Sequence, residues 1–83
     1  MISFEDIAFD EYRQWAKDDK NVFKKINALI TEIKRDPFHG TGKPEPLKWD
    51  WAGHWSRRLT DEHRLVYKVL KDQVIIVSCK YHY

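Results

Sequence analysis

Apolar positions recur at helical spacing over the first half of the chain. After a short extended segment at residues 1–4, this pattern predicts a helix over about 6–18 and a second helix over about 21–35. Pro37 ends the second helix, because the residue before a proline disfavours helical geometry. The opposite faces of both helices are charged, so we expect a helix hairpin whose charged faces are solvated, with an antitoxin-like or other protein partner on those faces as the alternative. The apolar stripe of the second helix comprises Val22, Phe23, Ile26, Leu29, Ile30 and Ile33.

The second half of the chain is typical of strands. After a loop over 38–46, four strands are predicted at 47–51, 55–59, 64–70 and 74 to about 81. The order is then β-α-α-β-β-β-β, which predicts an α+β fold with a helix hairpin on one face of a mostly antiparallel sheet. Because no linker or repeat interrupts this order, we expect residues 1–83 to form a single domain.

The last predicted hairpin decides where the charges of the sheet point. Side chains alternate along a strand, and we expect the odd-numbered residues, including Tyr81, to face the helices. A three-residue turn at 71–73 would place residue 64 opposite residue 80. The face that points away from the helices would carry Arg64, Lys68, Lys80 and His82. A sheet face with these side chains is either solvated surface or an anion-binding site, and the pattern leaves both open.

Composition narrows the class of protein. The chain has 83 residues, 42% of them hydrophobic, which favours a small folded core over disorder. Residues 1–42 carry 7 basic and 8 acidic side chains (net −1), whereas residues 43–83 carry 8 and 5 (net +3). We therefore expect an anionic partner to bind the second half. With a single cysteine, Cys79, and no long apolar segment or leader, the chain is expected to be cytoplasmic and without membrane contact.

The side chains available favour acid–base chemistry beside cations. Metal-free RNA cleavage needs a base for the 2′-hydroxyl, a cation for the charge that develops on phosphorus, and an acid for the leaving 5′-oxygen. His82 suits the acid, Arg64 suits the cation, and Tyr83 could stack on a nucleobase. No metal site and no cofactor are expected, because one cysteine and the spacing of four histidines match no zinc motif. Those histidines are His39, His54, His63 and His82.

Two carboxylates are candidates for the general base. Glu45 is held extended by the prolines that flank it, which suits a base presented to a substrate. It can equally be a surface acid in a stiff turn. Glu62 is the rival, since it lies just before the strand that carries Arg64. The predicted register places it opposite His82, where it could instead be the partner of that residue.

Four motifs resemble one known family. They are GKPEPLK at 42–48, WSRR at 55–58, EHRLVY at 62–67 and CKYHY at 79–83. In this order and spacing they resemble the YoeB (Txe) toxins of the RelE superfamily, over nearly the whole chain. The departures lie in the first helix and at 49–54. The resemblance implies a RelE-like, microbial-ribonuclease-like fold and the toxin of a type II toxin–antitoxin system.

The family's activity is implied in the same way. The resemblance implies a metal-independent endoribonuclease, an mRNA interferase that inhibits translation by cleaving mRNA in the ribosomal A site. Attack by the 2′-hydroxyl would give a 2′,3′-cyclic phosphate and a 5′-hydroxyl. The implied partners are mRNA, the 70S ribosome and a YefM-like antitoxin, and a homodimer is compatible with the family. The alternative is a non-catalytic protein on this scaffold, such as a ParE-like gyrase inhibitor or an RNA-binding module.

By this resemblance Glu45 matches the general base, Arg64 the transition-state cation and His82 the general acid. Tyr83 and Lys48 match residues that position the substrate. Arg57 and Arg58 point to opposite faces of a strand, and we favour Arg58 as the member of the site. The predicted sheet face adds Lys80 as a further substrate-binding residue.

Overall fold

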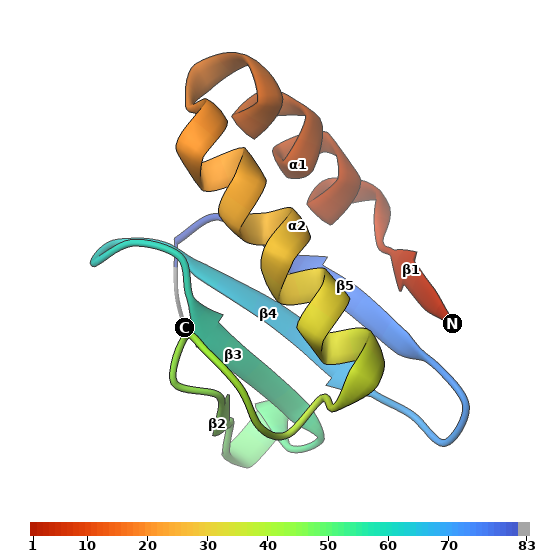
Figure 1. Cartoon of the computed structure of the whole chain (residues 1–83). Coiled ribbons are helices and arrows are strands. Elements are labelled where there is room, and N and C mark those ends of the chain that lie inside the picture. The colour runs from red at the N-terminus through yellow and green to blue at the C-terminus, as the bar shows by residue number, and fades with distance from the viewer. Residues whose placement is uncertain (82–83) are drawn as a thin grey trace.

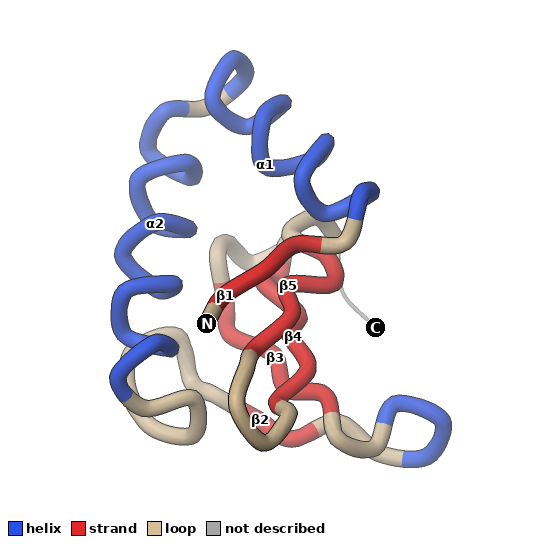
Figure 2. Tube along the Cα trace, turned by 90° about the vertical axis from the view of Figure 1, so that its right-hand side faces the viewer, coloured by secondary structure: helices blue, strands red, loops and turns tan. Residues whose placement is uncertain are grey.

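A hairpin of two helices lies across one face of a five-stranded sheet in the computed structural model, which describes residues 1–81 (Figure 1). Figure 2 shows the helices and the sheet as separate layers. The strand order is β1-β5-β4-β3-β2, and β1 and β5 run parallel while the other neighbours run antiparallel. The predicted α+β fold is confirmed. The elements are β1 (Ile2–Phe4), α1 (Asp6–Asp18), α2 (Lys20–Arg35), β2 (Glu45–Pro46), the 3-10 helix η1 (Trp49–Trp51), β3 (His54–Arg58), β4 (Arg64–Val69) and β5 (Val74–Ser78).

Local chemistry sets the helix boundaries, and apolar burial holds the hairpin on the sheet. The Asp19 side chain accepts hydrogen bonds from the backbone N–H groups of Asn21 and Val22 and so caps the start of α2. The helices bury their apolar faces against the sheet, at about 1.5–3 kcal/mol per large side chain. Neither helix is long and apolar enough to cross a membrane. The core residues include Ala8, Val22, Ile26, Leu29, Ile33, Leu65, Tyr67, Ile76 and Cys79.

The strand predicted at 47–51 is wrong. β2 comprises only Glu45 and Pro46, after which the Leu47 N–H makes one more hydrogen bond to the His54 carbonyl of β3, at 2.9 Å. Trp49–Trp51 form a 3-10 turn instead of a strand. β2 is an edge strand of the sheet, which is where a proline without an N–H group is tolerated. Trp49 has a positive φ of 60°, so the chain turns there before it enters β3.

A bulge that alternation did not predict interrupts the pairing of β4 with β5. Val69 pairs with Val74 beside the turn, whereas Val66 pairs with Ser78 further out, so Val77 is the extra residue. The Val66–Ser78 pair keeps the predicted register, whereas the pairs on the turn side are shifted by one residue. The predicted pairing of residue 64 with residue 80 is not formed, because β5 ends at Ser78 and the Arg64 N–H bonds to the Tyr81 carbonyl.

The bulge also changes which side chains of β5 reach the helices. Val74 and Ile76 belong to the core, so the prediction that Ile75 and Val77 would face the helices is wrong. The extra residue reverses the alternation, and Cys79 then returns to the core. Burial raises the pKa of its thiol to about 12, and the Glu11 carboxylate adds to this effect. A thiol with that pKa stays protonated near neutral pH and is inert as a nucleophile.

The last strand ends at Ser78, three residues earlier than predicted. Tyr81 is 58% exposed and has a positive φ of 60°, so the prediction that it turns toward the core is wrong. Alternation applies only while the strand continues, so Cys79 is buried as predicted whereas Tyr81, beyond the end of β5, is not.

Candidate functional site

The strand register places three predicted site residues on the sheet face opposite the helices. Glu45 pairs with Ser56, so it lies diagonally beside Arg58, two residues further along β3. Arg58 pairs directly with Arg64 of β4. Diagonal neighbours lie about 7–8 Å apart, within reach of long side chains. A carboxylate and two guanidinium groups therefore share one surface.

Within residues 1–81, the two arginines face each other without an acidic group that pairs with either of them. Like charges directly opposite on neighbouring strands destabilise a sheet. None of the ion pairs formed within residues 1–81 includes Arg58 or Arg64. Guanidinium groups bind phosphate through two parallel hydrogen bonds. This pair therefore has the chemistry of a site for a phosphate group.

Arg64 is held in place by the loop that precedes it. Its Nη1 donates to the backbone carbonyl oxygens of Thr60 (2.8 Å), Asp61 (3.2 Å) and His63 (3.1 Å). The hydrogen bonds that this guanidinium makes within the described chain all involve Nη1. Nε and Nη2 keep the other donors of the group, which are suitable for an incoming anion.

The C-terminal segment approaches the same site. The backbone N–H of Arg64 donates to the carbonyl oxygen of Tyr81 at 2.8 Å, so the chain leaves Tyr81 beside Arg64. The predicted acid His82 and the predicted stacking residue Tyr83 follow directly in the sequence and lie outside the described residues.

The two predicted substrate lysines lie apart. Lys48 is exposed at the start of η1, three residues after Glu45. The Lys80 Nζ lies 5.9 Å from the ring centroid of Trp15 in α1 and the same distance from that of Tyr81. The predicted grouping of Lys80 with Arg64 on one sheet face is therefore wrong, because β5 has already ended and Lys80 leans toward α1.

Glu62 and His63 belong to the loop before β4. Glu62 is mostly exposed, and its Oε1 lies 3.5 Å from His63 Nε2. From the sequence, His63 was considered only as a metal ligand. Its position directly before Arg64 was the sequence signal that it could have a different role near the site. In residues 1–81 no three His, Cys, Asp or Glu side chains come together as a group that could hold a metal ion.

A buried arginine fixes the other side of β3. Arg57 is fully buried, whereas its neighbour Arg58 is exposed. The guanidinium fills a space that Gly40 leaves open, because a Cβ there would strike both Glu32 and Arg57. Its hydrogen bonds tie the loop after α2 to the sheet. The acceptors are Tyr67 Oη, Glu32 Oε1 and the carbonyl oxygens of Asp36, His39 and Thr41.

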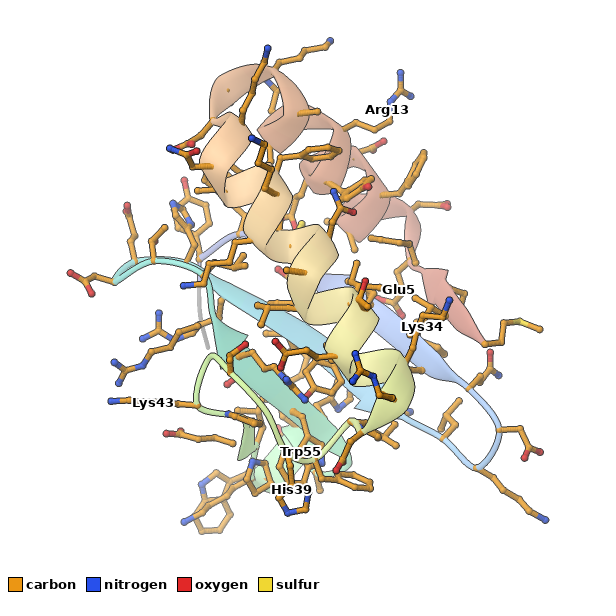
Figure 3. All side chains as sticks on the ribbon, viewed as in Figure 1. Glu5, Arg13, Lys34, His39, Lys43 and Trp55 are labelled. Carbon is orange, nitrogen blue, oxygen red and sulfur yellow. The ribbon has the colours of Figure 1, made fainter. Side chains whose placement is uncertain are left out.

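The same loop leads to Glu45. Its Gly42 carbonyl accepts a hydrogen bond from the Arg58 N–H at 2.7 Å, which holds the chain against β3 three residues before Glu45. Lys43 follows and extends into solvent (Figure 3). The buried cluster around Arg57 therefore supports the position of the proposed base from the opposite side of the sheet.

Because of this cluster, the free energy of unfolding should change with pH in the acid range. Hydrogen bonds from the Thr41 hydroxyl and N–H, together with Arg57, lower the pKa of Glu32 below its ordinary value of 4.5. The stabilisation is therefore complete above about pH 4.5 and is lost as pH falls through the lower folded-state pKa. In urea unfolding between about pH 6 and pH 3, Glu32→Gln should be less stable than wild type at the upper end, and the difference should shrink toward the lower end. A constant difference over this range would contradict the contribution of the carboxylate.

Comparison with known proteins identifies the family. A family model described as the YoeB-like toxin of bacterial type II toxin–antitoxin systems matches residues 4–83. Toxin YoeB of Streptomyces coelicolor is 55% identical over 82 residues, which cover 99% of this chain and 98% of the relative.

Solved structures agree with the sequence comparison. The YoeB/ParE toxin from Agrobacterium tumefaciens superposes with a TM-score of 0.95 at 45% identity and covers 99% of this chain and 98% of its own. A YoeB–YefM complex from Staphylococcus aureus contains a chain with a TM-score of 0.90 at 45% identity, covering 100% of this chain and 97% of its own. The resemblance seen in the four motifs is thus confirmed, and the chain belongs to the family of YoeB-like toxins of bacterial type II toxin–antitoxin systems.

Proposed function

We propose that this toxin is a ribosome-dependent endoribonuclease that cleaves mRNA in the ribosomal A site. The observation that carries the proposal is the arrangement of Glu45, Arg58 and Arg64 on the helix-free face of the sheet. A carboxylate next to two opposed arginines suits proton abstraction beside a phosphate whose charge increases during reaction. A site for binding alone would gain nothing from the carboxylate, which repels phosphate.

The proposed reaction begins at Glu45. Glu45 takes the proton of the 2′-hydroxyl, and the 2′-oxygen attacks the adjacent phosphorus. Arg64, with Arg58 beside it, stabilises the additional negative charge of the phosphorane. The bond from phosphorus to the 5′-oxygen breaks, and His82 gives that oxygen a proton. The products are a 2′,3′-cyclic phosphate and a 5′-hydroxyl, and this route requires no metal ion.

The remaining predicted residues bind the RNA. Tyr83 stacks on a base next to the cleaved bond and so aligns it. Lys48 follows the base Glu45 along the chain and contacts the RNA backbone on that side. Lys80 lies over the Trp15 ring and supplies a cation at the α1 edge.

Two partners, an antitoxin and the ribosome, accompany this function. A YefM-like antitoxin neutralises the toxin, as the YoeB–YefM complex of the Staphylococcus aureus relative suggests. The net charge of +3 over residues 43–83 suits ribosomal RNA, and the toxin acts on the ribosome in the cytoplasm, as a monomer or as a homodimer.

Programmed ribosomes test the activity directly. Purified toxin is added to 70S ribosomes that carry a labelled mRNA with a defined codon in the A site, and the product ends are mapped. We expect one cut in the A-site codon, a 2′,3′-cyclic phosphate on the upstream fragment, and little cleavage of the free mRNA. Ribosome binding without a cut would favour an RNA-binding module. Inhibition of gyrase supercoiling without a cut would favour a ParE-like toxin.

A further inference from the structure

In the last three described residues, 79–81, every backbone N–H and carbonyl group forms a hydrogen bond. Cys79 N–H donates to Glu11 Oε1 at 2.8 Å, and its carbonyl accepts from Trp15 Nε1 at 2.7 Å. The Lys80 N–H and carbonyl both bond to the Ser78 hydroxyl. The carbonyl of Tyr81 accepts from the Arg64 N–H. The remaining group, the N–H of Tyr81, donates to a side chain.

That side chain is His63. The Tyr81 N–H lies 2.8 Å from His63 Nδ1, donor nitrogen to acceptor nitrogen. An imidazole nitrogen accepts a hydrogen bond only when it carries no proton, so the proton of the neutral ring is on Nε2. The nearby carboxylate of Glu62, 3.5 Å from Nε2, favours the same tautomer.

Packing leaves this imidazole little freedom. Its side chain is 12% exposed. The Trp15 ring meets it edge-on with centroids 4.9 Å apart, and the Tyr81 ring lies 5.2 Å away. Tyr81 itself has a left-handed φ of 60°, which a residue with a side chain adopts when its surroundings hold it there.

We propose that His63 is a positioning residue for the reaction: its neutral ring, protonated on Nε2, fixes Tyr81 and thereby the point from which the chain continues to the acid His82. The inference rests on the proposed ribonuclease function. His63 is suited to this part because its own carbonyl also holds Nη1 of Arg64. One residue thus relates the transition-state cation to the segment that bears the acid.

Nitrogen NMR tests the contact in the wild-type protein without any activity. In protein labelled with ¹⁵N, the His63 ring should show an unprotonated Nδ1 and a protonated Nε2 near neutral pH. A scalar coupling across the hydrogen bond should connect Nδ1 to the Tyr81 amide nitrogen. A protonated Nδ1, or a Tyr81 amide without coupling to the ring, would overturn the proposal.

Two substitutions of His63 distinguish the effect of the hydrogen-bond acceptor Nδ1 from the effect of the aromatic ring. His63→Phe keeps an aromatic ring for Trp15 and Tyr81 but removes the acceptor. His63→Asn loses the ring but places an amide oxygen near the position of Nδ1. On programmed ribosomes we expect His63→Phe to lower kcat by about 10–100-fold with KM unchanged, since small displacements of catalytic groups have effects of this size. We expect His63→Asn to stay within about threefold of wild type.

The outcomes separate a positioning role from a structural one. If activity follows the thermal stability of the two variants rather than the presence of the acceptor, the proposal is wrong. Wild-type kcat in His63→Phe would also overturn it. If the wild type itself cuts no mRNA on the ribosome, the proposed function fails, and the NMR measurement still decides whether His63 holds Tyr81.

Discussion

Replacement of Arg64 by alanine is expected to lower the rate of mRNA cleavage on the ribosome by about 10²–10³-fold, the usual effect of removing a preorganised charge-stabilising group. The Arg64 guanidinium is preorganised by three loop carbonyls and lies opposite Arg58. The loss should fall on kcat, because the interaction strengthens as charge develops on the phosphate. Single-turnover cleavage with toxin in excess over programmed ribosomes measures this rate.

Two further variants make the result specific. Lys68 is a cation of the same strand and face, but it pairs with His54, away from Glu45, and Lys68→Ala should stay within about twofold of wild type. Arg64→Lys keeps the charge but loses the planar fork, and about a tenfold loss is expected. Equal losses in Arg64→Ala and Lys68→Ala would indicate a general contribution of positive charge and would contradict the assigned role of Arg64.

Replacement of Arg57 by methionine is expected to destabilise the fold by about 3–5 kcal/mol, as when one partner of a buried ion pair is removed. Arg57 is fully buried, and its guanidinium donates hydrogen bonds to five acceptor atoms. Methionine fills most of the volume but leaves three carbonyl oxygens and the Glu32 carboxylate without their donor. Urea unfolding followed by circular dichroism measures the change. Because small domains are stable by only about 5–15 kcal/mol, this loss is a large part of the total.

The adjacent residue supplies the control. Arg58→Met makes the same chemical change one position along β3 on the exposed face, and it should alter the unfolding free energy by less than about 0.5 kcal/mol. If Arg57→Met does not fold, Arg57→Lys retains the charge and can be measured in its place, with an intermediate loss expected. Equal stability of the Arg57 and Arg58 variants would show that the buried hydrogen bonds contribute little.

The two arginines of one motif thus have different tasks. Arg57 faces the helices and joins the loop after α2 to the sheet, whereas Arg58 faces the proposed substrate. A strand places adjacent side chains on opposite faces, so this division follows from the backbone. Activity measurements on Arg57 variants are therefore interpretable only beside their stability.

Hydrophobic spacing was sufficient for the fold class, both helices and three of the four strands of the second half. These features depend on local periodicity and on a single buried face. Alternation along the strand predicted only that Arg57 and Arg58 lie on opposite faces, and the tertiary structure places Arg58 opposite Arg64. The roles of Glu45, Arg64, His82 and Tyr83 stay predictions until cleavage is measured.

Only the tertiary structure decided how the last hairpin and the C-terminal segment are arranged. The bulge at Val77 depends on fitting Ile76 and Cys79 into one core, which no local pattern encodes. The direction of Lys80 and the contact of His63 with Tyr81 depend on α1 and on the loop before β4, which are distant in sequence. The sequence by itself determined the fold class and the candidate chemistry, because periodicity and residue type are local properties. The structure decided which side chains meet, because that depends on packing between segments far apart in the chain.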